Sequence, residues 1–315
     1  MPWRETPAEL ARARAERPFV VHAPAGRLFA VLTPPAPEAP PAELCVVLLT
    51  RPRSHRNRMW IEGARRLAAQ GFTTIRVDYH GCGDSGGDSA QLDPNRPYRD
   101  DVVAVIRHAR EHFGARRFVV SGACFDARTA LSAFAQEGGS IVGLVFMAAP
   151  VMELDTVVQV HADSKDWAHV WRALFKPDNW RALGQPGRWK HMAAVLGRVG
   201  GRSVGATSEL PLSAGFVDDF RALVNSKARA LFLYGHEDAE YASFRVAERT
   251  VFAALPPDVR ARFDVEVWPG SVHGFLEMTR QRETFTRAVS WIEALHPGAQ
   301  AAATAPQRTR LSAAS

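Results

Sequence analysis

The chain has 315 residues, of which 46% are hydrophobic, and a formal net charge of +6. This length predicts one large domain with an insertion, or at most two domains. The sequence contains no apolar run of the roughly 20 residues that a membrane-spanning helix needs, and its basic residues are scattered among acidic ones, which argues against nucleic-acid binding. The first residues lack the apolar core of a secretory signal, so we expect a cytoplasmic protein.

The cysteines give no sign of a disulfide framework or of a structural metal site. Cys45, Cys82 and Cys124 are an odd number of thiols and show no C-x-x-C spacing. Gly81-Cys82-Gly83-Asp84-Ser85-Gly86 has the outline of a dinucleotide loop but lacks the strand and helix context that such a loop requires. We therefore expect no metal and no cofactor.

The N-terminal part predicts an arm followed by a hairpin. Residues 1–18 are rich in Arg, Glu and Ala and offer little apolar surface to pack. Two apolar runs, 19–22 and 28–32, are joined through Pro24-Ala25-Gly26, which predicts an antiparallel hairpin at a sheet edge.

From Leu44 onward, strand and helix patterns alternate. Apolar runs predict strands at residues 44–49, 72–77, 118–120, 141–147, 231–234 and 265–268, and a last amphipathic helix ends before Pro297. Such alternation is typical of right-handed βαβ units, which build a mostly parallel sheet. Residues 299–315 are rich in Ala, Thr and Ser and predict a disordered tail.

Residues 151–226 interrupt this alternation and divide the predicted core into residues 19–150 and 227–298. The interruption contains two amphipathic helical patterns, and a helical insertion above the carboxyl ends of parallel strands predicts a lid. Three of its tryptophans are candidate substrate-binding residues: Trp167, Trp171 and Trp189. For a single Trp, anchoring the lid to the body is the more common role.

Cys124 is the candidate nucleophile. It follows an apolar strand and the small residues Gly122 and Ala123, and it precedes a helical pattern that starts at Ala127. This strand-to-helix corner matches G-x-S-x-G with sulfur in place of oxygen. The unpaired N–H groups and partial positive charge at a helix start favour a thiolate. The alternative is a buried, inert cysteine that packs as a small hydrophobic residue.

Two further strand ends carry a candidate acid and base. Asp238 follows the strand 231–234, and His273 lies in the loop after the strand 265–268. A cysteine nucleophile needs a base, and the base needs an orienting group. We therefore predict Cys124, Asp238 and His273 as the catalytic residues, with Glu153 and Asp155 as alternative acids. Their order along the chain is nucleophile, acid, base.

With these motifs the chain resembles the α/β-hydrolase superfamily over residues 19–297. Asp78-Tyr79-His80-Gly81-Cys82-Gly83-Asp84-Ser85 is similar to the D-x-x-G-x-G-x-S loop of that superfamily. Within it, the chain looks closest to serine-aminopeptidase-like hydrolases, especially the exosortase A-associated kind, which carry Cys at the corner and a basic loop after the first parallel strand, here Arg51 to Met59. The resemblance implies a three-layer α/β-hydrolase sandwich, a mostly parallel sheet with a helical lid insertion.

The oxyanion hole departs from the usual pattern. The chain has Thr50-Arg51-Pro52-Arg53 where relatives carry His-Gly, and Pro52 has no N–H to donate. We expect the backbone N–H of Phe125 as one donor and Arg51 or Arg53 as the second. Asp126 replaces the last Gly of the corner motif; we interpret it as a favourable charge in the first turn of the helix, with a second catalytic carboxylate as the alternative.

The predicted reaction is acyl transfer through Cys124, by a thioesterase or acyltransferase. The substrate would be an ester or thioester, with the acyl chain carried by coenzyme A or an acyl-carrier protein. Two alternatives remain open at this stage. One is a small-ester or lactone hydrolase of the dienelactone type, and the other is a non-catalytic α/β-hydrolase-like binding protein.

Overall fold

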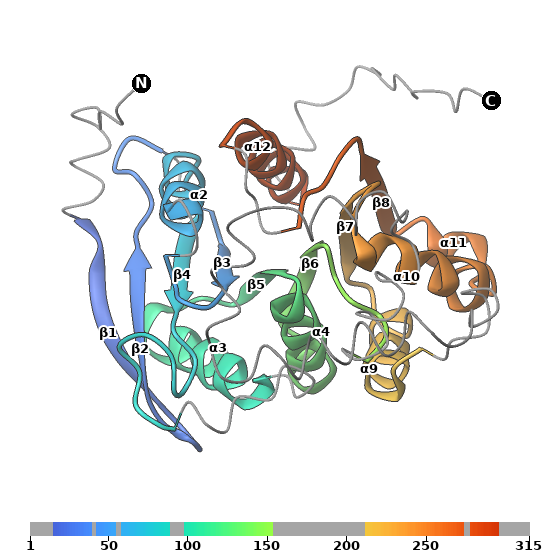
Figure 1. The fold of residues 1–315 in the computed structure, drawn as a ribbon. Coiled ribbons are helices and arrows are strands. Elements are labelled where there is room, and N and C mark those ends of the chain that lie inside the picture. The colour runs from blue at the N-terminus through green and yellow to red at the C-terminus, as the bar shows by residue number, and fades with distance from the viewer. Residues whose placement is uncertain are drawn as a thin grey trace, which may run out of the picture.

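The computed structural model describes residues 15–39, 42–54, 58–88, 98–153, 212–273 and 278–295. In this part of the chain eight strands form one sheet in the order β1-β2-β4-β3-β5-β6-β7-β8 (Figure 1). The strands are β1 (Arg17–Ala23), β2 (Gly26–Thr33), β3 (Leu44–Leu49), β4 (Thr73–Val77), β5 (Arg117–Ala123), β6 (Ile141–Met147), β7 (Arg229–Gly235) and β8 (Phe263–Trp268).

The sheet is mostly parallel, as predicted. β1 and β2 form the predicted antiparallel hairpin, β2 also pairs antiparallel with β4, and the strands from β4 to β8 pair parallel. All six residues of β3 are buried. A strand of a parallel sheet is covered by helices on both faces, and for this reason the central strands are continuous apolar runs in the sequence.

Helices cover both faces of the sheet and make three layers (Figure 1). They are α2 (Met59–Ala69), α3 (Arg99–Phe113), α4 (Phe125–Glu137), α9 (Ala214–Val224), α10 (Ala239–Ala247), the π-helical turn η5 (Glu248–Phe252), α11 (Pro257–Arg260) and α12 (Met278–Ala294). The buried side chains of α2 and α12 share one apolar core with one face of the sheet, and those of α3, α4, α9 and α10 share another with the opposite face. The predicted three-layer architecture is confirmed.

The helix α9 lies inside the range predicted for the lid, residues 151–226. Its buried residues Phe216, Phe220 and Leu223 belong to the core formed by α4 and the sheet. This part of the range predicted for the lid thus packs on the body of the domain. Residues 154–211, which contain the rest of the predicted lid, lie outside the described residues.

The described part of the predicted arm is anchored to the body. Glu16 pairs with Arg65 at 3.0 Å and with the buried Arg76 at 2.9 Å. Residues 1–14 and the predicted tail, 299–315, lie outside the described residues. Within the described ranges, no helix combines the length and the apolar character needed to cross a membrane.

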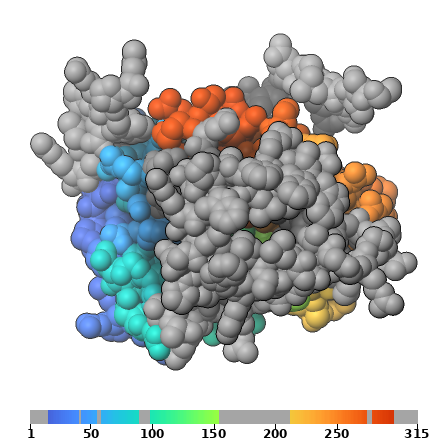
Figure 2. Space-filling model, in the orientation of Figure 1, coloured from blue at the N-terminus to red at the C-terminus, as the bar shows by residue number. Residues whose placement is uncertain are grey.

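The fold brings the predicted site residues to one edge of the sheet. Arg51, Cys124, Asp238 and His273 follow β3, β5, β7 and β8, which run parallel, so their carboxyl ends lie together. Figure 2, in the orientation of Figure 1, shows the strands of the N-terminal hairpin in blue on one side of the molecule and the helices that follow β7 in orange on the other.

Candidate active site

Cys124 occupies a strained corner between β5 and α4. Its backbone has φ 54° and ψ −126°, a conformation that non-glycine residues rarely adopt. The Cys124 N–H donates to the carbonyl of Met147 on the neighbouring strand at 2.8 Å, which fixes the corner. A Cβ atom at Gly122 would come within 2.4 Å of the main chain of Asp126. The corner therefore requires glycine at residue 122, and Cys124 lies partly exposed at its tip.

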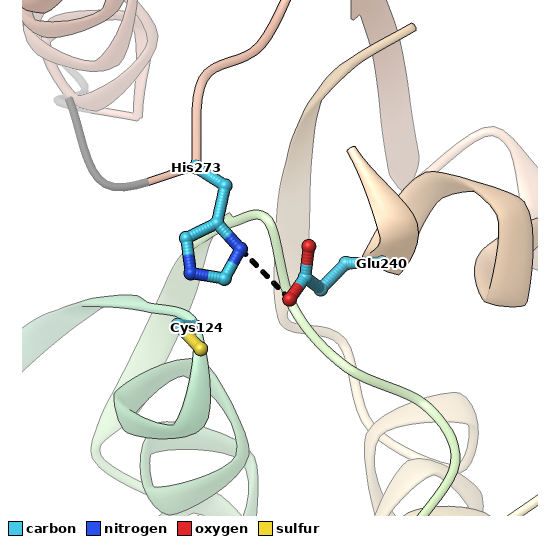
Figure 3. Close-up of side chains that lie close together, drawn as sticks. All are labelled: Cys124, Glu240 and His273. Carbon is cyan, nitrogen blue, oxygen red and sulfur yellow. Dashed lines mark ion pairs between the residues drawn. The ribbon is translucent and has the colours of Figure 1, made fainter. Parts of the chain in front are cut away.

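His273 lies in the loop after β8 and points toward Cys124 (Figure 3). Its ring Nδ1 is 2.8 Å from Oε1 of Glu240. The ring is thereby oriented by a carboxylate on one side, and its other nitrogen, Nε2, is left for the thiol. This is the relation of nucleophile, base and orienting acid that nucleophilic catalysis requires.

The acid that contacts the ring is Glu240, not the predicted Asp238. The Asp238 carboxylate accepts hydrogen bonds from the N–H groups of Gly235 at 2.7 Å, Val272 at 3.2 Å and His273 at 3.1 Å. It also accepts one from the hydroxyl of Ser271. These bonds join the loop after β7 to the loop after β8. Asp238 therefore holds the backbone of His273, while the predicted contact with its ring is corrected to Glu240.

Glu240 was missed in the sequence although it lies only two residues beyond Asp238. It stands in the first turn of α10 with its side chain 6% exposed, and Oε2 is buried without a hydrogen-bond partner in the described structure. The sequence did offer a signal, since a second acid follows the strand end closely. Choosing between the two acids requires knowing which one faces the His273 ring, and that depends on the loop geometry.

The surroundings of His273 favour its protonated form. Hydrogen bonding to Cys124 and to Glu240 raises the pKa of His273 to about 11, although burial acts in the opposite direction. At neutral pH the ring thus holds a proton, with Cys124 on one side and Glu240 on the other. A protonated imidazole beside the nucleophile can pass its proton to a leaving group.

Two groups are candidates to stabilise an oxyanion: the N–H of Phe125 and the side chain of Arg51. Phe125 is the first residue of α4, so its N–H has no acceptor within the helix. The Arg51 side chain is 27% exposed, and its Nε lies 3.5 Å from the Asp126 carboxylate. Arg51 also lies over the ring of Tyr98, at 5.9 Å from its centroid.

Arg53, the other predicted donor, is committed elsewhere. Its N–H donates to Asp78 Oδ1 at 2.6 Å, and its guanidinium bonds Asp78 and, at 2.8 Å, Asp84. These bonds secure the loop 78–85 against the loop after β3. The prediction that Arg53 contributes to the oxyanion hole is therefore not supported by its contacts, and Arg51 remains as the candidate.

Asp126 is a buried carboxylate beside the corner. Burial raises its pKa to about 6, while the charge of Arg51 acts in the opposite direction. Asp126 lies in the first turn of α4 as predicted, but its raised pKa means that burial outweighs the favourable effect of the helix start on the charge. The ion-pair partner of Asp126 is Arg51, which follows β3, at 3.5 Å.

Of the remaining residues that the sequence analysis singled out, some lie in the part of the chain that the structure describes and others do not. Glu153 is half exposed and lies 3.7 Å from Arg128, so its contact is on α4 rather than at the His273 ring. Burial raises the pKa of Cys45 to about 12, as expected for an inert core thiol. The other predicted residues lie outside the described part of the chain: Asp155, Trp167, Trp171 and Trp189.

Comparisons with known proteins agree with this architecture. Residues 40–186 match the family model described as serine aminopeptidase, S33. That range includes Cys124 and the loop after β3. A comparison with curated protein sequences found no significant match.

Solved structures resemble the chain over most of its length. A proline iminopeptidase from Mycobacterium smegmatis is 16% identical, with a TM-score of 0.58, 88% of this chain covered and 98% of that one. An esterase from Pyrococcus furiosus is 15% identical, with a TM-score of 0.58 and coverages of 93% and 96%. A lidless α/β serine hydrolase from Xanthomonas campestris is 15% identical, with a TM-score of 0.52 and coverages of 93% and 97%. Identities this low establish a shared fold.

Proposed function

We propose that Cys124 is the nucleophile of an acyl-transfer reaction. The chain has the α/β-hydrolase fold, and its family match supports a hydrolase-type enzyme. The observation that carries this proposal is the convergence of Cys124, His273 and Glu240. One polar atom from each lies within 4.8 Å of the other two. Three side chains from distant parts of the sequence meet at the edge of the sheet where this fold places its chemistry.

In the first half of the reaction, the Cys124 thiolate attacks the carbonyl carbon of an ester or thioester. A C–S bond forms and the carbonyl electron pair moves to oxygen, which becomes an oxyanion. When the oxyanion collapses, the bond to the leaving alkoxide or thiolate breaks, and His273 supplies the proton that neutralises it. The acyl group is then held as a thioester on Cys124.

In the second half, His273 accepts a proton from the incoming acceptor, which is water, an alcohol or a thiol. The acceptor attacks the acyl thioester, and the Cys124 thiolate leaves. Glu240 keeps the His273 ring oriented throughout and stabilises its positive charge. Because the thioester intermediate is itself activated, a cysteine enzyme suits transfer to another alcohol or thiol as well as hydrolysis.

The oxyanion forms between the start of α4 and the end of β3. The N–H of Phe125 supports it from one side, with the partial positive charge of the helix N-terminus behind it. Arg51 supplies the second donor through its guanidinium, since Pro52 has no N–H. Asp126, two residues after Cys124, lies 3.5 Å from the Nε of Arg51 and would help to position that guanidinium.

The substrate class follows from the chemistry of the nucleophile and the charge of the chain. Acyl groups carried by coenzyme A or an acyl-carrier protein are thioesters on anionic carriers. A net charge of +6 favours encounter with such partners. The tryptophans of residues 154–211 remain candidate contacts for the acyl chain.

Intact-mass spectrometry after exposure to acyl thioesters and p-nitrophenyl esters tests the proposal. The expected result is a mass increase equal to one acyl group, located on Cys124 by peptide mapping and absent from Cys124→Ala. Cys82→Ala serves as a matched control, because that thiol lies in the loop after β4 and should leave acylation unchanged.

The panel of substrates also separates the alternatives. Rapid turnover of small free esters without turnover of thioesters would favour a hydrolase of the dienelactone type. An absence of acylation with every substrate, in a protein whose Cys124 is accessible to iodoacetamide, would favour a non-catalytic binding protein.

A further inference from the structure

We propose that Cys124, His273 and Glu240 form a binding site for a divalent transition-metal ion of the zinc type. Each residue offers one ligand atom: a sulfur, a ring nitrogen or a carboxylate oxygen. These three atoms lie within 4.8 Å of one another. Among the residues that the structure describes, this is the only group of potential metal ligands that lies so close together. The site depends on the sulfur atom of Cys124, which is the strongest of the three potential ligands.

The ligand set is one that zinc prefers. Zinc binds cysteine thiolates, imidazole nitrogens and carboxylate oxygens, and sites with three protein ligands leave a fourth position open to water. A hydroxyl group in place of the Cys124 thiol is a much poorer ligand, because thiolates are the soft donors that select this metal. The same corner with serine would therefore lack the strongest of the three ligands.

The distances allow a metal ion with small side-chain adjustments. A point at the centre of three atoms separated by at most 4.8 Å lies within about 2.8 Å of each atom, while zinc needs about 2.0–2.3 Å. The His273 nitrogen and the Glu240 oxygen already lie 2.8 Å apart. Side-chain rotations that move the ligand atoms by about 0.5–0.8 Å close the difference.

Glu240 gives an independent indication of a vacant coordination position. Its side chain is only 6% exposed, yet Oε2 has no hydrogen-bond partner in the described structure. An ionised carboxylate with a buried, unpaired oxygen is costly unless a cation or donor satisfies it. The Cys124 thiolate and the Glu240 carboxylate each carry one negative charge. Together they would balance the two positive charges of a divalent ion.

The site is accessible from solution. The His273 side chain is 44% exposed and Cys124 is partly exposed, so an ion can reach the ligands without unfolding the sheet. Asp238 stays with its main-chain donors and keeps the His273 backbone in place while the ring adjusts.

Metal binding would inhibit the enzyme reversibly, and this consequence rests on the proposed function. The ion takes the sulfur electron pair that attacks the carbonyl, and it displaces into solvent the proton that the His273 ring nitrogen carries. Binding itself depends only on the three side chains and is measurable without a substrate.

Titration with Co²⁺ of the tag-free protein, first freed of metal with a chelator, tests the site directly. We expect a thiolate-to-cobalt charge-transfer absorption that saturates at one ion per chain and is displaced by Zn²⁺. It should be lost in Cys124→Ser and retained in Cys82→Ser. Glu240→Gln should weaken Zn²⁺ binding by at least about 10-fold in isothermal titration calorimetry. A band that is absent from the wild type, or unchanged in Cys124→Ser, would overturn the proposal.

A second measurement uses only the wild-type protein, so its result does not depend on whether the variants fold. In the wild-type protein, Zn²⁺ should slow iodoacetamide labelling of Cys124 and leave labelling of Cys82 unchanged, and EDTA should restore the rate. Equal labelling of Cys124 with and without Zn²⁺ would contradict the site. Because neither readout needs turnover, a protein that binds the metal but acylates with no substrate would retain this inference and lose the proposed function.

Discussion

At the scale of single residues, two carboxylates divide the tasks that surround His273. Asp238 bonds the His273 N–H at 3.1 Å and Glu240 bonds its ring at 2.8 Å. One carboxylate fixes where the residue lies, and the other fixes how its ring is turned. Substitutions at the two positions should consequently have different effects.

Glu240→Gln should lower kcat by about 10²–10⁴-fold with a small change in melting temperature, since the ring loses its orienting charge but the loop stays intact. Asp238→Asn should lower the melting temperature as well, because its carboxylate accepts hydrogen bonds from two loops. Steady-state kinetics together with thermal melts measure both effects. A larger kinetic loss in Asp238→Asn at an unchanged melting temperature would return the acid role to Asp238.

The protonation of His273 gives a second test. Its pKa, raised to about 11 by Cys124 and Glu240, predicts a protonated ring at neutral pH. A raised folded-state pKa contributes stability that is fully present below the unfolded value near 6.5 and is lost as pH rises through the folded value. NMR of isotope-labelled histidine should show no titration of His273 between pH 6 and 8 in the wild type, and titration at lower pH in Glu240→Gln. A wild-type midpoint near 6.5 would contradict the hydrogen-bonded arrangement.

Sequence patterns predicted the parts of this site that depend on local structure. Cys124 stands at a strand-to-helix corner whose small residues are visible in the chain, and His273 follows a strand through Pro269-Gly270. The acid was beyond reach because Asp238 and Glu240 are both close to the end of β7. Only the packing of α10 decides that Glu240 faces the ring.

At the scale of elements, the helix α4 links Cys124 to α9. Arg128 of α4 is buried and donates to the hydroxyl of Ser213 at 2.7 Å and to the carbonyl of Met152 at 3.4 Å. Ser213 is the N-cap of α9 and accepts from the Phe216 N–H. A single guanidinium thus joins the chain after β6 to the start of α9.

Arg128→Met should destabilise the protein by about 1–3 kcal/mol, because the change leaves buried hydrogen-bond partners unpaired. Arg107→Met is a matched control on α3, since Arg107 forms an exposed ion pair with Glu137, which should contribute at most about 1 kcal/mol. Urea denaturation followed by circular dichroism measures both. An equal decrease in the free energy of unfolding in the two variants would show that the buried hydrogen bonds of Arg128 stabilise the protein no more than an exposed ion pair does.

Elements were predicted well where their pattern stood alone. The central strands are uniform apolar runs, and their predicted limits differ little from the observed ones. The helix α9 was absorbed into the predicted lid because it follows a long stretch of Trp-containing helical pattern. Its own signals were present, with Ser213 as a cap and Phe216, Phe220 and Leu223 at helical spacing.

At the scale of the whole molecule, the buried Asp126 makes stability depend on pH. Its pKa, about 6, lies above its usual value of 3.8 because the site is buried. A raised pKa means that folding favours the protonated carboxyl. The stabilising contribution is fully present below pH 3.8 and is lost as pH rises through about 6.

Asp126→Asn should therefore raise the melting temperature at pH 8 and change it little at pH 4. At pH 8 the free energy of unfolding should rise by no more than about 3 kcal/mol, because Arg51 offsets part of the cost of burying the Asp126 charge. Thermal unfolding across this pH range measures the difference between the two proteins. A variant that is less stable than the wild type at pH 8 would show that the ion pair with Arg51 outweighs burial.

The separate roles of Asp238 and Glu240 also bear on how such an enzyme can evolve. Because the loop that carries the base is held by Asp238, a lineage can exchange the residue at position 240 without first losing the base. By this inference, variants at position 240 should stay folded, because the hydrogen bonds of Asp238 hold the loop without Glu240. We therefore expect more tolerance of substitution at Glu240 than at Asp238, whose carboxylate joins two loops.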